Sequence, residues 1–375
     1  MYFVVKGFYL LLQTCENSQS HNAFSSGAAH LNHTAPINVA VVGVGVFGRN
    51  HARLYRQLQQ ENLVRLVGVV DPDTARADSI AREFDCRAFG SIEQMLTTHN
   101  EVEAASVAVP TCLHLEAART LIEAGIDVLI EKPLASSLAE ADELIALAKK
   151  HNRVVQVGHL ERFNPAVRAT LSLIAQPMFF EVHRLSVFSP RALDVDVILD
   201  LMIHDLDIVL TFVNSPVEEI RAVGLPILSG KVDIANVRLE FQSGCVANLT
   251  ASRVSTERVR KLRFFQPRQY ISIDYGRQDV LVFTVDNTAS PSFQSASAPG
   301  TLGMGAASPS VNPHIQVAKP PVNNEEPLSA EIRSFLQSVR GRSSPVVSLE
   351  DGRKALDLAL RVLNEISRHA GRVGL

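Results

Sequence analysis

The sequence contains few cysteines and lacks both long hydrophobic runs and strongly basic runs. Its four cysteines, Cys15, Cys86, Cys112 and Cys245, are far apart and form neither a C-x-x-C pair nor the spacing of zinc ligands. We therefore expect reduced thiols in a cytoplasmic protein, and no metal site. No apolar run reaches the ~20 residues that a membrane span requires, so a membrane is not an expected partner.

The charge balance excludes a further class of partner. The formal net charge is −3 and no basic cluster is present, which argues against binding to nucleic acid or to an anionic membrane surface. A content of 46% hydrophobic and 20% charged residues is typical of a folded globular enzyme. At 375 residues the chain is long for a single core, so we expect two domains.

Residues 1–36 do not resemble part of a fold. They begin with an apolar stretch that is interrupted by Lys6, and they continue with a segment rich in Ser, His, Asn and Ala. A secretory signal is one reading, but the lysine lies inside the apolar run and no clean cleavage site follows. We interpret this segment as a disordered or artefactual extension.

The sequence INVAVVGVGVFGRNH at Ile37–His51 is the strongest local signal. A β-branched apolar run predicts a buried strand, and Gly43, Gly45 and Gly48 follow it in G-x-G-x-x-G spacing before a predicted helix. A second predicted strand ends at Asp71, which lies 23 residues after Gly48. This arrangement predicts a dinucleotide site, with the pyrophosphate at the helix N-terminus and Asp71 on the ribose hydroxyls.

Predicted strands and helices alternate from Ile37 to about residue 160. This pattern indicates an α/β domain, a Rossmann-type doubly wound parallel sheet over residues 37–160. Ligands of such sheets bind beyond the carboxyl ends of the strands. The residues directly after each predicted strand are therefore the candidates for ligand contacts.

The pattern changes after about residue 160. A helix is predicted at Val195–Phe212, followed by several strand-like runs with few helices between them. We expect an α+β domain over residues 161–345 with an open, mostly antiparallel sheet, and a C-terminal helix over residues 346–375. Residues 286–326 are rich in Ser, Pro, Ala, Gly and Asn, and we expect a mobile insertion there.

Five motifs together resemble the Gfo/Idh/MocA family of sugar and cyclitol dehydrogenases. They are GVGVFGRNH at Gly43–His51, VPTCLH at Val109–His114, EKPLA at Glu131–Ala135, GHLERFNPA at Gly158–Ala166 and DLMIHDLD at Asp200–Asp207. The last two are most similar to the branch that contains UDP-N-acetylglucosamine 3-dehydrogenases. The resemblance implies a homodimer or homotetramer, and hydride transfer from a secondary hydroxyl of a sugar or sugar nucleotide.

The resemblance also assigns the catalytic roles. Lys132 matches the EKP lysine that is implied to contact the substrate hydroxyl and the nicotinamide ribose. Asp200 and His204 match a substrate-binding aspartate and an acid/base histidine. Removal of a hydroxyl proton requires such a base near a cation. Asp200 and His204 are four residues apart on the predicted helix, so we expect them to pair, with Asp205 or Asp207 as alternative partners of the imidazole.

The remaining candidates follow the strand ends and the domain crossover. The expected cofactor contacts are Gly43, Gly45, Val46, Phe47, Gly48, Asp71, Val109, Pro110, Thr111, His114, Glu131 and Lys132. The expected substrate contacts are His159, Glu161, Arg162, Asn164, Asp200 and His204. A solvated crossover loop with ion pairs is the alternative for the segment Gly158–Asn164. His51 reads mostly as structural, and Arg253 is a weaker candidate for the substrate or a subunit interface.

We expect NAD rather than NADP. A 2′-phosphate beside Asp71 would meet a like charge, Pro72 offers no cation, and Arg76 lies more than a helical turn away in the sequence. Two other functions keep the fold: a non-catalytic NAD-binding regulatory protein, and an enzyme that recycles a bound NAD. The intact set of Lys132, Asp200 and His204 argues against the first of these.

Overall fold

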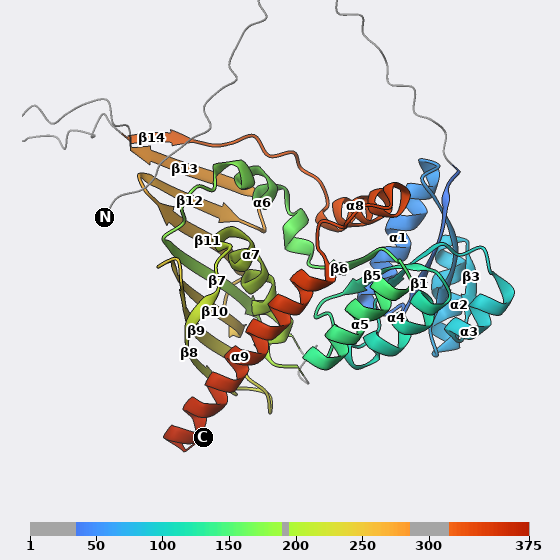
Figure 1. Cartoon of the computed structure of the whole chain (residues 1–375), viewed down its shortest axis with the longest axis horizontal. Coiled ribbons are helices and arrows are strands. Elements are labelled where there is room, and N and C mark those ends of the chain that lie inside the picture. Colours follow the sequence, from blue (N-terminus) through green and yellow to red (C-terminus); the bar gives the residue numbers. More distant parts are fainter. Residues whose placement is uncertain (1–34, 190–194, 286–314, 375) are drawn as a thin grey trace, which may run out of the picture. The chain divides into compact units, whose positions relative to one another are not determined.

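The computed structural model describes residues 35–189, 195–285 and 315–374. The extension predicted for residues 1–36 lies outside them apart from its last two residues, and so does most of the insertion predicted for residues 286–326. Two sheets carry the described chain, drawn with their helices in Figure 1.

The first sheet contains six parallel strands in the order β3-β2-β1-β4-β5-β6. Its strands are β1 (Ile37–Val42), β2 (Val64–Val70), β3 (Arg87–Phe89), β4 (Ala104–Val107), β5 (Asp127–Glu131) and β6 (Val155–Gly158). Its helices are α1 (Val46–Gln60), α2 (Thr74–Phe84), α3 (Ile92–Thr98), α4 (His114–Glu123) and α5 (Leu138–Lys150). The predicted Rossmann fold is confirmed, and the strand order reverses between β1 and β4, where such sheets bind dinucleotides.

The central strands form because their side chains are buried on both faces. Val39 and Val41 belong to one hydrophobic cluster, and Ala40 and Val42 to another on the opposite face of the sheet. Alternating side chains of one strand therefore pack into two separate cores. This double burial explains why β1 is a continuous apolar run in the sequence.

The second sheet contains eight strands in the order β14-β13-β12-β11-β7-β10-β9-β8. They are β7 (Phe179–Val187), β8 (Val217–Leu225), β9 (Ile234–Phe241), β10 (Val246–Ser255), β11 (Val259–Gln266), β12 (Gln269–Asp274), β13 (Asp279–Val285) and β14 (Ile315–Ala318). The pair β7–β10 is parallel and the other neighbouring pairs are antiparallel. The predicted α+β domain with a mostly antiparallel sheet is confirmed.

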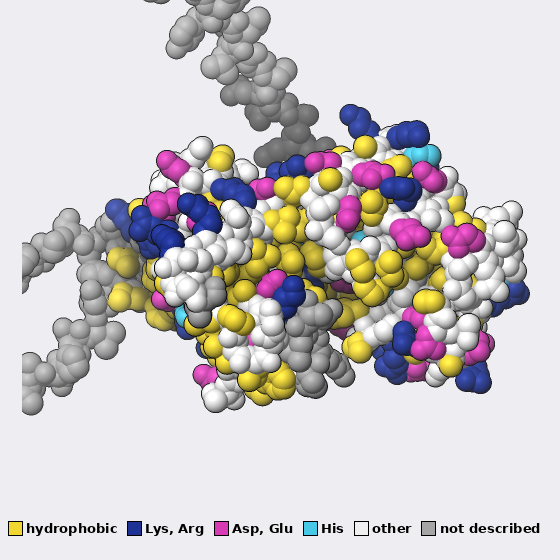
Figure 2. Space-filling view, turned by 90° about the horizontal axis from the view of Figure 1, so that it is seen from below, with side chains coloured by type: hydrophobic (Ala, Val, Ile, Leu, Met, Phe, Trp, Pro, Cys, Tyr) yellow, Lys and Arg dark blue, Asp and Glu magenta, His cyan; other side chains and the backbone are white. Residues whose placement is uncertain are grey.

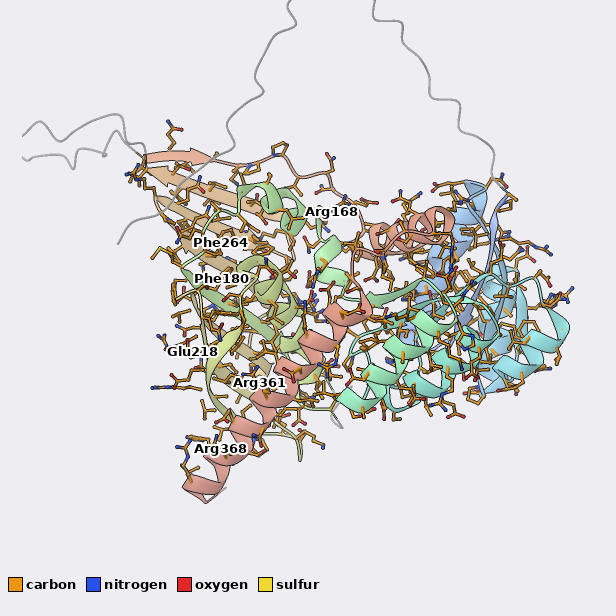
Figure 3. All side chains as sticks on the ribbon, in the orientation of Figure 1. Arg168, Phe180, Glu218, Phe264, Arg361 and Arg368 are labelled. Carbon is orange, nitrogen blue, oxygen red and sulfur yellow. The ribbon has the colours of Figure 1, made fainter. Side chains whose placement is uncertain are left out.

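One face of this sheet is buried beneath helices. Along β7 and β11 the buried residues alternate with partly exposed ones, and Phe180 and Phe264 stack with ring centroids 5.4 Å apart. Figure 3 shows these two side chains on neighbouring strands. Helix α7 (Ile203–Val213) covers this face, since Phe212 contacts both rings. The alternation predicted from the sequence thus places a hydrophobic core under α7.

Two local predictions differ from the structure. The helix expected at Val195–Phe212 is a π-helix over Ile198–Met202 that continues into α7. A π-turn adds a residue to a helical turn and changes which side chains share a face, a change that hydrophobic periodicity does not reveal. Strand β14 lies inside the stretch expected to have no regular structure, and it pairs with the end of β13.

The two last helices pack against different parts of the fold. The buried residues of α8 (Pro327–Gly341), such as Ile332 and Phe335, join the hydrophobic cluster of β1 and α1. Helix α9 (Leu349–Val373) contacts α5 and β6 of the first sheet and α7 and β8 of the second domain. Helix α8, although it follows the second sheet in the sequence, therefore completes a hydrophobic core of the first domain. None of the described helices is both long and apolar enough to cross a membrane.

Candidate active site

The glycine loop between β1 and α1 has the geometry of a phosphate cradle. Gly43 has φ +83°, and a Cβ on Gly48 would lie 1.7 Å from the Gly43 carbonyl oxygen, so both positions require glycine. A Cβ on Gly45 would meet nothing within 4 Å. The space above Gly45 is open, as backbone contact with a pyrophosphate requires. The neighbouring Val46 and Phe47 are exposed at the N-terminus of α1.

Asp71 lies at the carboxyl end of β2 and is almost fully buried. Its Oδ2 accepts a hydrogen bond from Val44 N at 3.0 Å, and its Oδ1 accepts one from Asp73 N at 3.0 Å. The Nη1 atom of Arg76 lies 3.3 Å from both carboxylate oxygens. The expectation that Arg76 is too distant to matter is therefore wrong, because the first turn of α2 folds its side chain back over Asp71.

A pocket extends from the glycine loop past the ends of β2 and β4. It is lined by Val42, Gly43, Val70, Pro72, Gly90, Ser91, Ile92, Glu93, Val109, Leu113, Glu116, Ala117 and Thr120. Its largely apolar walls and its position beside Asp71 fit the adenosine end of a dinucleotide. Pro110 and Thr111 follow Val109 at its mouth, in the short turn that leads into α4.

His114 links two of the strand ends. Its Nδ1 lies 3.0 Å from the Pro133 carbonyl oxygen and its Nε2 lies 3.0 Å from the Val109 carbonyl oxygen. Burial lowers the pKa of His114 from its ordinary value of 6.5, although the carbonyl oxygens oppose that shift. His114 thereby fixes the backbone after β4 against the backbone after β5, where the nicotinamide end of a cofactor is expected.

Lys132 follows β5 and reaches into the second domain. Its Nζ donates a hydrogen bond to the backbone carbonyl of Asp200 at 2.6 Å and lies 3.7 Å from Asp200 Oδ1. Burial lowers the pKa of Lys132 from its ordinary value of 10.5, and the carboxylates of Asp200 and Glu131 partly offset this effect. Residues 68 positions apart in the sequence are thus brought into one buried contact.

His204 shares this site with Lys132. Burial and then the positive charge of Lys132 lower the pKa of His204 well below its ordinary 6.5. The imidazole is therefore neutral at pH 7 and able to accept a proton. Its Nδ1 is buried and has no hydrogen-bond partner among the residues that the structure describes. The expected pairing with Asp200 is absent among the described contacts, because the π-turn directs the Asp200 carboxylate toward Lys132 instead.

The crossover segment after β6 is held by buried ion pairs. Arg162 donates two hydrogen bonds to Asp207, at 2.7 and 2.6 Å. Glu161 accepts from Arg184 Nη1 at 2.9 Å and from Asn164 Nδ2 at 3.1 Å. These contacts match the ion pairs of the alternative reading, but His159, Glu161 and Asn164 are buried rather than solvated. Direct substrate contacts by Glu161, Arg162 and Asn164 remain a prediction, as does one by His159, whose ring nitrogens are buried without partners.

Asp205 and Asp207 do not orient the imidazole of His204. Arg184 forms two hydrogen bonds to Asp205, at 2.7 and 2.9 Å, and Asp207 is paired with Arg162. Both aspartates therefore connect α7 to the β-sheet and to the crossover segment. The expectation that either acid faces His204 is wrong, since arginines distant in sequence take both carboxylates.

Comparisons with known proteins agree with this geometry. The family model for the Gfo/Idh/MocA oxidoreductase family, NAD-binding Rossmann fold, matches residues 37–159, and the model for the family's C-terminal domain matches residues 176–272. The chain belongs to the Gfo/Idh/MocA family.

Individual relatives lie within the same family. UDP-N-acetylglucosamine 3-dehydrogenase of Acidithiobacillus ferrooxidans is 35% identical over 328 residues, which cover 87% of this chain and 96% of that protein. Its solved structure superposes with a TM-score of 0.77 at 32% identity, over 89% of this chain and 98% of that one. The NAD(+)-dependent scyllo-inositol 2-dehydrogenase of Bacillus subtilis is 28% identical over 240 residues, covering 58% and 68%.

A buried polar chain beneath the EKP motif of this family member was not predicted. Tyr55 Oη lies 2.8 Å from Ser106 Oγ, which lies 3.0 Å from His51 Nδ1, and His51 Nε2 lies 2.8 Å from Glu131 Oε1. His51, read as structural from the sequence, thus contacts the residue before Lys132. Glu131 is thereby held at the end of β5, and its charge acts on Lys132.

Glu331 lies beside this chain on α8 and was also missed. It is fully buried, and neither carboxylate oxygen has a hydrogen-bond partner. Burial, and then the charge of Glu131, raise the pKa of Glu331 well above its ordinary 4.5. Burial therefore favours the neutral, protonated form of this carboxyl in the folded protein. Only the amphipathic pattern of α8 could have placed Glu331 on the buried face.

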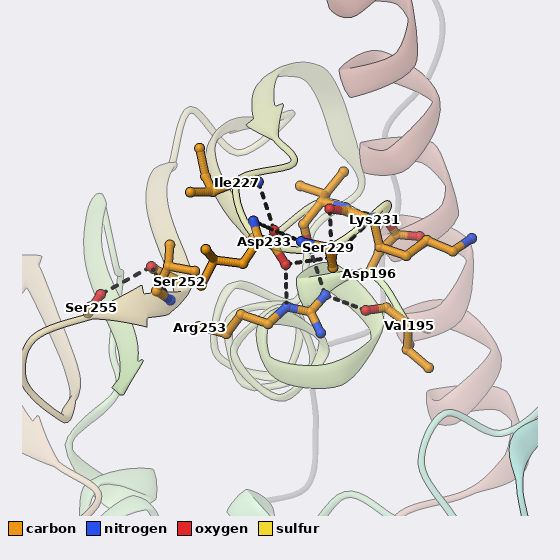
Figure 4. A network of polar contacts seen from close by, with 12 residues as sticks. Val195, Asp196, Ile227, Ser229, Lys231, Asp233, Ser252, Arg253 and Ser255 are labelled. Atoms are coloured by element: carbon orange, nitrogen blue, oxygen red, sulfur yellow. Dashed lines mark hydrogen bonds and ion pairs between the residues drawn. The ribbon is translucent and has the colours of Figure 1, made fainter. Parts of the chain in front are cut away.

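Arg253 has a structural position rather than one facing the cofactor. It lies 3.1 Å from Asp233 Oδ1, and it donates to the carbonyl oxygens of Val195 and Val232. Burial alone would raise the pKa of Asp233, but the Ser229 hydroxyl and the backbone N–H groups of residues 227–229 hold it at about 2. This network, drawn in Figure 4, connects β10 to the segment that precedes Asp200.

Glu331→Gln tests the neutral state of this carboxyl. In the wild type the folded-state pKa is raised, so the unfolding free energy falls as the pH rises above 4.5 toward the folded pKa. The variant lacks this loss. We expect the free energy of unfolding of the variant to exceed that of wild type by an amount that grows by on the order of 1 kcal/mol per pH unit across that window. Urea unfolding followed by circular dichroism measures the difference. Exposed Glu257→Gln is the control, and parallel pH curves for Glu331→Gln and the wild type would contradict a buried neutral acid.

Proposed function

We propose that this protein is an NAD-dependent dehydrogenase that oxidises a secondary hydroxyl of a sugar nucleotide, of the UDP-N-acetylglucosamine type. The observation that carries the proposal is the hydrogen bond from Lys132, which follows β5 of the first domain, to the backbone of Asp200 in the second domain, four residues before His204, on which the charge of Lys132 acts. The 35% identity to a UDP-N-acetylglucosamine 3-dehydrogenase over most of both chains supports the substrate class.

The two side chains take complementary roles. His204 is neutral and accepts the proton of the substrate hydroxyl. Lys132 is a buried cation that stabilises the negative charge developing on that oxygen, and a substrate hydroxyl would replace the Asp200 carbonyl as its acceptor. Asp200 then contacts the substrate from the same turn. Bound NAD supplies the hydride acceptor, and the residues around Gly45 and Asp71 would hold it.

Lys132→Ala tests the catalytic assignment. We expect turnover to fall by about 1,000-fold or more, because the developing oxyanion loses its cation, while NAD still binds. NADH absorbance measures turnover on UDP-sugars, free aldoses and inositols, and titration calorimetry measures NAD binding. Exposed Lys149→Ala serves as the control. Unchanged turnover removes Lys132 from the mechanism, and turnover without added NAD indicates a recycled cofactor instead.

The cofactor preference depends on Asp71. Its carboxylate would accept hydrogen bonds from the ribose 2′- and 3′-hydroxyls and repel a 2′-phosphate. Arg76, which contacts Asp71, is the one feature that favours NADP at this position. We propose NAD because Asp71 and Asp73 together balance this single cation, and Arg76 Nη2 lies 2.9 Å from Asp73 Oδ2.

Asp71→Ser should therefore shift the preference toward NADP. We expect wild type to have a higher kcat/KM with NAD than with NADP. In Asp71→Ser the ratio of these two values should fall about tenfold or more, because Arg76 becomes available to a phosphate. The double variant Asp71→Ser with Arg76→Ala should not gain NADP use, and is the matched control. Kinetics with both cofactors give the ratios. A wild type that prefers NADP would refute the assignment.

The outer face of the second sheet supports a homo-oligomer. Phe179, Phe265, Tyr270 and Phe283 form an aromatic stripe across four strands, with successive ring centroids 5.6, 5.0 and 5.5 Å apart. Figure 2 shows one face of the protein, on which hydrophobic side chains gather near the middle with charged side chains around and among them. A continuous aromatic stripe on an open sheet is the kind of surface that a second copy covers.

Phe265→Glu tests this surface. A charge within a buried aromatic stripe would cost binding free energy, so we expect dissociation toward monomers in light scattering after gel filtration. Lys354→Glu, an exposed charge reversal on α9, is the control and should leave the wild-type mass unchanged. A wild type that is monomeric over the whole concentration range would overturn the proposed homodimer or homotetramer.

A further inference from the structure

Arg260, near the start of β11, carries a guanidinium group that its surroundings leave unpaired. Its Nε is buried and has no hydrogen-bond partner. No ion pair of its side chain is found within residues 35–189, 195–285 and 315–374. Many other arginines of the described chain contact a carboxylate, as Arg162 and Arg184 do. Arg260, a partly buried residue, therefore differs from these arginines.

The strand register places Arg260 on the buried face of the sheet. Leu262 and Phe264, two and four residues further along β11, are fully buried on that face. Arg260 lies directly opposite Arg184 of β7 in the antiparallel pair. Like charges in opposed positions destabilise a sheet unless a counter-charge intervenes. Arg184 takes both of its neighbouring acids, Asp205 and Glu161, as hydrogen-bond partners, and none is left to contact Arg260.

The charge of Arg260 acts on the catalytic histidine. It is one of the cations that, after burial and Lys132, lower the pKa of His204. Burial, and then the charge of Arg184, lower the pKa of Arg260 from its ordinary 12.5. Arg260 also lies at the end of the sheet where Arg253 of β10, which is separated from β11 by β7, donates to Val195, just before the π-turn that carries Asp200. The guanidinium therefore lies on the His204 side of the second sheet.

A partly desolvated cation without a partner is unfavourable in the free protein. Such a group persists where a ligand supplies the missing anion, and its guanidinium fork matches two phosphate oxygens at once. The pyrophosphate of the cofactor is already accounted for at Gly43–Gly48, on the first domain. The anion that Arg260 would meet therefore belongs to the second ligand, the substrate.

We propose that Arg260 binds the diphosphate of a nucleoside-diphosphate sugar and so selects nucleotide sugars over free sugars. This inference rests on the proposed function, because it assigns a binding residue to the substrate of that reaction. It commits to a diphosphate rather than a sugar carboxylate, since the related dehydrogenase is named for a UDP-sugar. In this arrangement Lys132 and His204 act at the sugar hydroxyl, and Arg260 holds the part of the substrate that does not react.

Arg260→Gln provides the test. Arg260→Lys retains the positive charge but lacks the planar guanidinium that can donate to two phosphate oxygens. We expect Arg260→Gln to raise the KM for UDP-N-acetylglucosamine by roughly 30-fold with little change in kcat. Arg260→Lys should recover part of that loss. UDP alone should bind wild type in titration calorimetry, and its Kd for Arg260→Gln should be higher by the same factor. Since Arg260 has no ion-pair partner among the described residues and its charge is unfavourable in the free protein, the unliganded Arg260→Gln should melt at a temperature no lower than that of wild type.

Arg263→Gln is the matched control, on the same strand but on the opposite face, where Arg263 lies 3.7 Å from Glu181. It should leave KM and UDP binding unchanged. Equal UDP binding by wild type and Arg260→Gln would overturn the inference, as would a wild type that binds UDP-glucuronate through its carboxylate but not UDP. Failure of the proposed function is distinct: wild type would then oxidise no sugar nucleotide, whatever the result of UDP titration.

Discussion

The hydrogen bond from Lys132 to the Asp200 carbonyl is the interaction on which the arrangement of the site depends. A buried ammonium needs acceptors, and the nearest ones come from the second domain. The contact joins the end of β5, where a cofactor's reactive ring is expected, to the turn that carries Asp200 and His204. Shifting either element would leave a desolvated cation, so the geometry of the site and the packing of the domains are maintained together.

Buried ion pairs fix the second half of the site in the same way. Arg184 connects the sheet to α7 through Asp205 and to the crossover through Glu161, and Arg162 connects the crossover to α7 through Asp207. Each pair contains two hydrogen bonds or adjoins another pair, so the desolvated charges are satisfied within the protein. His204 lies among these groups, yet stays neutral because burial, and then the charges of Lys132 and Arg184, lower its pKa.

The first domain and its glycine loop were predictable because their signals are local. The conformation and spacing that require Gly43, Gly45 and Gly48 lie within one turn of the chain. A strand such as β1 is recognisable from its own composition. The partners of the site residues were not predictable in this way. Arg184 reaches Asp205 across 21 positions, and Arg162 reaches Asp207 across 45. The π-turn at Ile198–Met202 leaves no pattern in hydrophobicity, so the expected contact between Asp200 and His204 was wrong.

The position of α8 shows why the chemistry cannot be assigned to one domain. This helix follows the second sheet in the sequence, yet its apolar side packs on β1 and α1, and it places Glu331 beside Glu131. Two neighbouring carboxyls in a buried site do not both ionise readily, and the charge of Glu131 favours the protonated form of Glu331. Glu131 in turn counteracts the loss of charge that burial imposes on Lys132. The carboxylate at the end of β5 thus favours the cationic state of the lysine, and a lysine that stays protonated is what an oxyanion-stabilising role requires.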